Sequence, residues 1–131
     1  MAKSQCAVLD CPDVLEPARF HRSLLGGEVN RPDPRWSPDE HRSTLHTDGG
    51  FVLAFQHAAD HRPPRWGDPA RPQQFHLDLG VEDPDGAAAG ALAPGAAVLD
   101  DGGGERGRAV LADPAGHPFR LVREQPSRPG A

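Results

Sequence analysis

The alternation of apolar and polar positions predicts the same order of elements in each half of the chain. In the first half, residues 6–11 alternate like a strand, and the Pro-Asp pair that follows ends the strand and starts a helix that runs to residue 25. Phe20, Leu24 and Leu25 form one apolar stripe on this helix, and two glycines supply the positive φ that stops it. Further strands are expected near residues 28–30, 43–47 and 51–57.

The second half repeats this order of strand, helix and three strands. A strand is expected at residues 76–81, then a helix from Pro84 to about Leu92, where a proline suits the first turn. The remaining strands are expected near residues 97–99, 108–111 and 118–123. The three glycines at 102–104 are expected to form a hairpin tip, and residues 125–131 a frayed tail.

The two halves also share a motif. Cys6 precedes Asp13 by seven positions and His76 precedes Asp83 by seven, so the two motifs are offset by 70 residues (76 − 6 and 83 − 13). An internal repeat of this kind predicts one domain, residues 1–131, built from modules at 5–57 and 74–123. Residues 58–73 are then a linker, and residues 124–131 a flexible tail.

Composition narrows the classes of partner. A net charge of −5 with scattered arginines leaves no basic stripe for nucleic acid. No apolar run reaches the roughly 20 residues of a membrane span, and no signal peptide is expected, which favours the cytoplasm. Cys6 and Cys11 fall on opposite faces of one strand, so free thiols are expected rather than a disulfide.

Several polar and aromatic side chains are candidates for a binding site. Alternation places His76 and Asp78 together on one face of their strand, opposite the apolar positions that must pack under a helix. His76 is therefore either a ligand contact, a general base or a structural hydrogen-bonding residue. Trp36 and Trp66 lie in polar stretches, where one is expected to stack on a flat ligand at a rim and the other to anchor a loop. Phe55 is counted among the candidate ligand contacts, although a core position is favoured for it.

Three segments carry a resemblance to a known superfamily. They are residues 13–26 (DVLEPARFHRSLLG), 76–83 (HLDLGVED) and 112–119 (ADPAGHPF). With them the chain, over about residues 5 to 123, resembles the glyoxalase, bleomycin-resistance and extradiol-dioxygenase superfamily, also called vicinal oxygen chelate proteins. The resemblance implies an α+β fold of two tandem βαβββ modules whose mixed sheets curve into a cup, with helices on the outer face. It also implies that the protein is a homodimer.

Metal-dependent members of that superfamily take ligands at positions that correspond to Cys6, Gln56, His76 and Arg120. A guanidinium has no lone pair to donate, so Arg120 breaks the chelating set. Neither a metal nor another cofactor is therefore expected, and Cys6 is more simply explained as a small apolar filler. Gln56 stays among the candidate ligand contacts.

Arg120 has two possible roles. It could hold an anionic group of a ligand through its bidentate fork, or it could pair with an aspartate inside the cup, such as Asp78 or Asp10. The negative net charge would instead suit a cationic ligand, and the sequence leaves this choice open.

These observations favour a metal-independent protein that binds or sequesters a natural-product or antibiotic-like small molecule near His76, Asp78 and Arg120, as a bleomycin-resistance protein does. The alternative is an enzyme, a glyoxalase-like lyase, isomerase or dioxygenase that uses His76 with or without a divalent metal. A structural dimer module without a ligand is a third possibility, weakened by the polar face and the two tryptophans.

Overall fold

A computed structural model describes residues 1–100 and 108–124 of the chain. These residues group into two compact units, one made of Met1–Pro63 with Asp113–Ala115 and the other of the remaining residues. The glycines expected at a hairpin tip and the expected tail at 125–131 lie outside the described residues.

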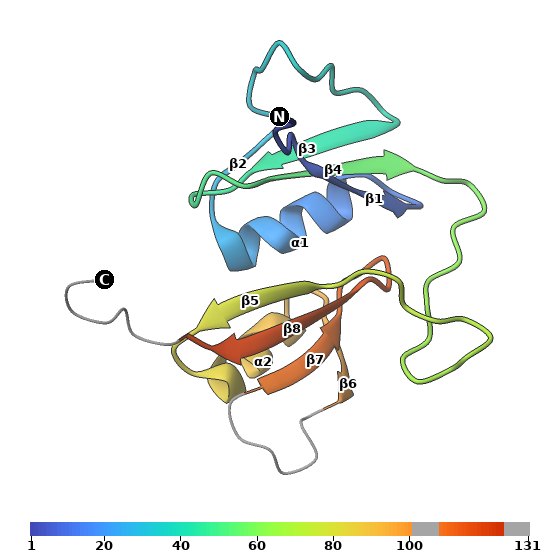
Figure 1. The fold of residues 1–131 in the computed structure, drawn as a ribbon, viewed down its shortest axis with the longest axis vertical. Helices are drawn as coiled ribbons and strands as arrows, with labels where there is room; N and C mark the ends of the chain where they lie inside the picture. Colours follow the sequence, from blue (N-terminus) through green and yellow to red (C-terminus); the bar gives the residue numbers. More distant parts are fainter. Residues whose placement is uncertain (101–107, 125–131) are drawn as a thin grey trace. The chain divides into compact units, whose positions relative to one another are not determined.

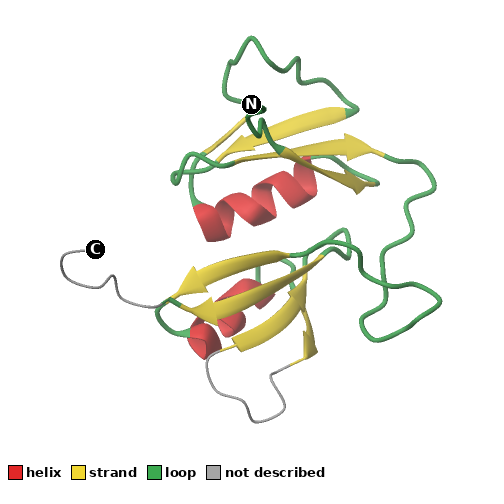
Figure 2. Cartoon of the chain, in the orientation of Figure 1, coloured by secondary structure: helices red, strands yellow, loops and turns green. Residues whose placement is uncertain are grey.

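The first unit is a four-stranded sheet with one helix. Its elements are β1 (Ala7–Cys11), α1 (Leu15–Leu25), β2 (Glu28–Val29), β3 (Arg42–His46) and β4 (Val52–His57). The strand order is β1-β4-β3-β2, with β1 parallel to β4 and the other neighbours antiparallel (Figure 1). The helix lies along one face of the sheet (Figure 2).

The core of this unit lies between α1 and the sheet. Phe55 and Leu45 have no exposed surface and alternate with residues that point away from the helix. Ser43 donates a hydrogen bond of 2.6 Å from its hydroxyl to the carbonyl of Val14 and so ties β3 to the start of the helix. Alternation leaves the opposite face of the sheet, which we call the face away from α1, to more polar side chains.

The helix stops where the sequence predicts. Gly27 has φ of 102°, and a Cβ there would collide with the carbonyl oxygen of His46 on β3. A glycine is needed at this point both for the backbone conformation and for the close approach of the chain to the sheet. At the other end, Asp13 accepts a hydrogen bond from the amide of Leu15 at 2.9 Å, so the helix itself begins two residues after the expected aspartate.

The second unit repeats the arrangement. Its elements are β5 (Leu77–Val81), α2 (Pro84–Leu92), β6 (Ala97–Asp100), β7 (Arg108–Ala112) and β8 (Pro118–Arg123). The strand order is β5-β8-β7-β6, with β5 parallel to β8 (Figure 1). Leu111, Phe119 and Leu121 are almost completely buried, as is Ala91 of the short, alanine-rich helix α2.

The predicted α+β class and the two tandem βαβββ modules are confirmed, and no strand bound differs from the expected one by more than one residue. Cys6 and Cys11 are free thiols, as expected, and Cys11 is fully buried. Neither helix of the described part of the chain is long and apolar enough to cross a bilayer.

Candidate functional site

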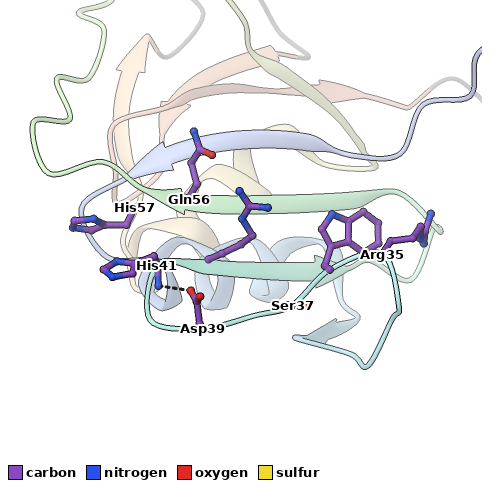
Figure 3. Close-up of a pocket in the computed structure, with 8 residues that line it drawn as sticks. Arg35, Ser37, Asp39, His41, Gln56 and His57 are labelled. Carbon is purple, nitrogen blue, oxygen red and sulfur yellow. Dashed lines mark hydrogen bonds between the residues drawn. The ribbon is translucent and has the colours of Figure 1, made fainter.

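A cavity of about 510 Å³ opens in the first unit (Figure 3). This volume falls in the range typical of small-molecule sites. Its lining comes from the segment between β2 and β3 and from the ends of β3 and β4: Arg35, Trp36, Ser37, Asp39, His41, Arg42, Gln56 and His57.

Two of the lining residues belong to the face of the sheet away from α1. The strand register places Arg42 of β3 opposite Gln56 of β4, and Gln56 opposite Asp10 of β1. Gln56 donates from Nε2 to the Asp10 Oδ1 at 2.7 Å. The three side chains therefore form a polar row across three neighbouring strands, with Gln56 fixed by the carboxylate.

The segment between β2 and β3 is held in a defined conformation. Asn30, in a left-handed conformation with φ of 57°, accepts a hydrogen bond from the amide of Thr44 at 2.9 Å. Asp33 accepts one from the amide of Arg35, also at 2.9 Å. Prolines at 32, 34 and 38 restrict the backbone further. The wall of the cavity is thus ordered by its own local contacts rather than by a ligand.

Trp36 is fixed from two sides. The guanidinium of Arg35 lies 4.2 Å from the centroid of its ring, and His46 meets the ring edge-on with centroids 5.7 Å apart. Both neighbours in turn contact Asp33, Arg35 through Nη2 at 2.8 Å and His46 through Nε2 at 3.2 Å. The hydrogen bonds from Arg35 lower the pKa of Asp33, so this carboxylate stays charged and holds the arrangement together.

The other end of the cavity carries two imidazoles. The rings of His41 and His57 lie 5.3 Å apart, and Figure 3 shows them side by side, away from Arg35. The amide of His57, the last residue of β4, donates to the carbonyl of His41 at 2.8 Å. This bond extends the pairing of β3 with β4 by one residue before β3 begins. Asp39 accepts from the amide of His41 at 2.8 Å, the contact dashed in Figure 3.

A second polar cluster lies in the second unit and contains the histidine singled out from the sequence. Arg120 of β8 binds Asp78 of β5 in a bidentate fork, Nε to Oδ1 at 2.7 Å and Nη2 to Oδ2 at 2.6 Å. His76 Nε2 lies 3.1 Å from the same Asp78 Oδ1, and its Nδ1 lies 3.1 Å from Gln73 Oε1. Arg120 lowers the pKa of Asp78, and Asp78 raises the pKa of Arg120. Of the two roles considered for Arg120, the structure shows the ion pair.

The other residues predicted for the site fall in different places. Phe55 is completely buried on the helix side of the sheet, where its ring stacks on His21 with centroids 5.7 Å apart. Phe55 thus occupies the core position favoured for it, because strand alternation turns it away from its neighbour Gln56. Trp66 lies in the segment between the modules and is 38% exposed.

The chelating set of the metal-dependent relatives does not fit this chain. Within residues 1–100 and 108–124, no three side chains of His, Cys, Asp or Glu come together in a way that could hold a metal ion. Arg120 stands where the resemblance implies a ligand, and its guanidinium is already bound to Asp78.

Of the residues singled out from the sequence, Trp36 and Gln56 line the cavity, whereas most of the lining was not among the candidates. The residues missed are Arg35, Ser37, Asp39, His41, Arg42 and His57. The available signal was the proline-rich segment around Trp36, which connects the neighbouring antiparallel strands β2 and β3. Arg42 could have been found from its cross-strand position opposite Gln56.

The comparisons with known proteins agree on one family. The model of the glyoxalase-like domain matches residues 6–122. No curated protein sequence matches the chain significantly.

Solved structures share the fold at low sequence identity. A glyoxalase/bleomycin resistance protein/dioxygenase family enzyme from Burkholderia phytofirmans PsJN is 18% identical, with a TM-score of 0.68 over 93% of this chain and 98% of that one. The bleomycin-binding protein from bleomycin-producing Streptomyces verticillus, complexed with copper(II)-bleomycin, is also 18% identical, with a TM-score of 0.55 over 95% and 100%. The antibiotic binding protein TnmS3 from Streptomyces sp. CB03234 is 21% identical, with a TM-score of 0.55 over 95% and 99%.

The family model spans nearly the whole of both modules, and the βαβββ order of elements within each unit is the one that the resemblance implies. The chain belongs to the glyoxalase-like domain family.

Proposed function

We propose that the protein binds and sequesters a small organic molecule without the help of a metal, in the manner of the bleomycin-resistance type. The observation that carries this proposal is the cavity of the first unit, with Trp36 in its wall and Gln56 in its floor. The bleomycin-binding and antibiotic-binding proteins that share the fold support the same class of function.

The cavity has the properties that binding requires. Its wall is ordered by prolines and by the contacts of Asp33, so little conformational entropy is lost when a ligand enters. Trp36 offers an aromatic surface at its rim, and Gln56 offers an oriented amide. The lining is otherwise polar, so a ligand would be held by stacking on Trp36 and by several placed polar groups.

Tryptophan fluorescence provides the test. In the Trp66→Phe variant Trp36 is the single tryptophan, and we expect saturable quenching by members of a panel of polycyclic aromatic natural products. In the matched Trp36→Phe variant, which retains Trp66, the quenching should be absent and calorimetry should show weakened binding. Saturable binding of equal strength in both variants would place the ligand elsewhere and refute this site.

A second function is favoured by the cluster of the second unit. His76 is held between Asp78 and Gln73, which fixes the orientation of its imidazole, and a substrate that displaces the Gln73 side chain would reach a ring nitrogen for proton transfer. A metal-independent lyase or isomerase could use such a group. Product formation by the native protein that disappears in His76→Ala, while binding in the cavity is unchanged, would favour this enzyme over the sequestration protein.

A further inference from the structure

We propose that the ligand of the first unit's cavity is an aromatic carboxylate, and that Arg42 is the residue that selects it. This inference rests on the proposed function, because it names the chemical class of the molecule that the same cavity takes.

Arg42 differs from Arg35, the other arginine of the cavity lining, and from the paired arginines Arg31 and Arg120. Arg35 is bound to Asp33, Arg31 to Glu28 and Arg120 to Asp78. The guanidinium of Arg42 makes no ion pair or side-chain hydrogen bond with any residue in the described ranges, 1–100 and 108–124. It nevertheless lines the cavity.

The register explains why Arg42 points into the site. It stands opposite Gln56 on the face of the sheet away from α1, and Gln56 is turned toward Asp10 on the far strand. A planar guanidinium with its donors unused offers the bidentate geometry that a carboxylate prefers. The neighbouring amide of Gln56 adds a polar group to the same row.

Among the charged groups of the lining, Arg42 is the one that can bind an anion. Two arginines line the cavity against one carboxylate, that of Asp39. Asp39 accepts the amide hydrogen bond of His41, and its own backbone pairs with the backbone of Arg42, so its side chain caps the segment instead of neutralising the guanidinium. Asp33 binds Arg35 from outside the lining, so Arg42 is the arginine of the lining that no carboxylate of the described residues contacts.

The aromatic part of the ligand follows from Trp36. Its ring is fixed by Arg35 and His46, so a flat molecule can stack on or against it without ordering the side chain first. An aromatic ring at Trp36 with its acid group at Arg42 uses both features of the cavity. Arg42 is exposed, so an acid group adds a charge-assisted hydrogen-bond pair there, whereas a neutral aromatic adds none.

Isothermal titration calorimetry with three matched pairs of compounds tests the inference. The pairs are benzoate and benzamide, 2-naphthoate and 2-naphthamide, and 9-anthracenecarboxylate and its amide. We expect at least one carboxylate to bind about 10-fold or more tightly than its amide, because a charge-assisted hydrogen-bond pair is lost in the amide. Arg42→Gln should abolish that difference, and Arg42→Lys, which keeps the charge but not the fork, should retain part of it.

Arg31→Gln is the matched control, since it removes the same charge from an exposed arginine outside the cavity lining. It should bind the carboxylate as the native protein does, and circular dichroism should show that all three variants are folded. Amides that bind as tightly as the acids, or an Arg42→Gln variant that keeps the preference, would overturn the assignment of an anionic ligand while leaving a binding cavity. Failure of every acid and every amide to bind would overturn the aromatic binding site itself.

Discussion

The removal of one buried imidazole should destabilise the first unit strongly. His21 of α1 lies with Nε2 2.8 Å from Oδ2 of Asp113, and the two side chains are 1% and 0% exposed. The other oxygen of Asp113 accepts the amide of Ala115 at 2.9 Å. His21 also stacks on Phe55, so a single side chain joins the helix, the sheet and a turn 92 residues away in the sequence.

The expected magnitude follows from this burial. His21→Ala leaves the Asp113 carboxylate in the interior without its imidazole, a change that costs about 3–5 kcal/mol for buried pairs. That loss is a large part of the roughly 5–15 kcal/mol that stabilises a typical domain. The exposed pair of His41 and Glu40, with side chains 65% and 85% exposed, serves as the control, and its loss should cost at most about 1 kcal/mol.

Urea unfolding followed by circular dichroism measures both effects. With a slope of about 1–3 kcal/mol per molar urea, the midpoint for His21→Ala should fall by about 1 M or more, whereas that of His41→Ala should hardly move. In a double-mutant cycle, His21→Ala in an Asp113→Ala background should cost clearly less than it does in the native protein. A His21→Ala midpoint close to that of the control, or strictly additive effects in the cycle, would refute the importance of this contact.

Three further predictions concern other parts of the chain. Burial raises the pKa of the Cys11 thiol to about 11. Iodoacetamide at pH 8 should therefore modify only the partly exposed Cys6 in the folded protein, and both thiols in urea. Rapid labelling of the folded Cys6→Ser variant, whose remaining thiol is Cys11, would contradict this. Because Arg120 lowers the pKa of Asp78, the stability from their pair is present above the unfolded-state pKa of about 4 and is lost as the pH falls through the lower folded-state value. The melting temperature of the native protein should therefore fall more steeply between pH 4 and pH 2 than that of Asp78→Asn, and parallel curves would show that the pair contributes nothing. Gly27→Ala should lower the melting temperature by several degrees through backbone strain and collision with β3, whereas Gly49→Ala, at a position with open space, should not.

Most of the fold could be predicted because local signals and the repeat agree. The apolar stripe predicts the first helix, and the glycines after Leu25 mark its end. The proline at 84 marks the start of the second helix, and the structure reproduces both boundaries. The bounds that differ do so through side-chain contacts: the hydrogen bond from Leu15 to Asp13 begins the helix later than its first polar residue suggests. The register between β5 and β8 depends on long-range pairing and could be placed only through the family resemblance.

The candidate site was harder to predict because a charged side chain can bind a ligand ion only where no neighbouring group of the protein neutralises it. The sequence pointed to Arg120 as the cation of the site. The register of β5 and β8 places it beside Asp78, however, and its Nε and Nη2 donate to that carboxylate. Arg42 belongs to no recognisable motif. The pairing of β3 with β4 places it beside Gln56 in the cavity lining, where no carboxylate of the described residues pairs with it. Which arginine is available for a ligand is therefore decided by cross-strand neighbours, which a single sequence does not specify. The same argument makes the distinction testable at one position, since moving an acid beside Arg42 through Gln56→Glu should neutralise it and remove the affinity for an aromatic carboxylate.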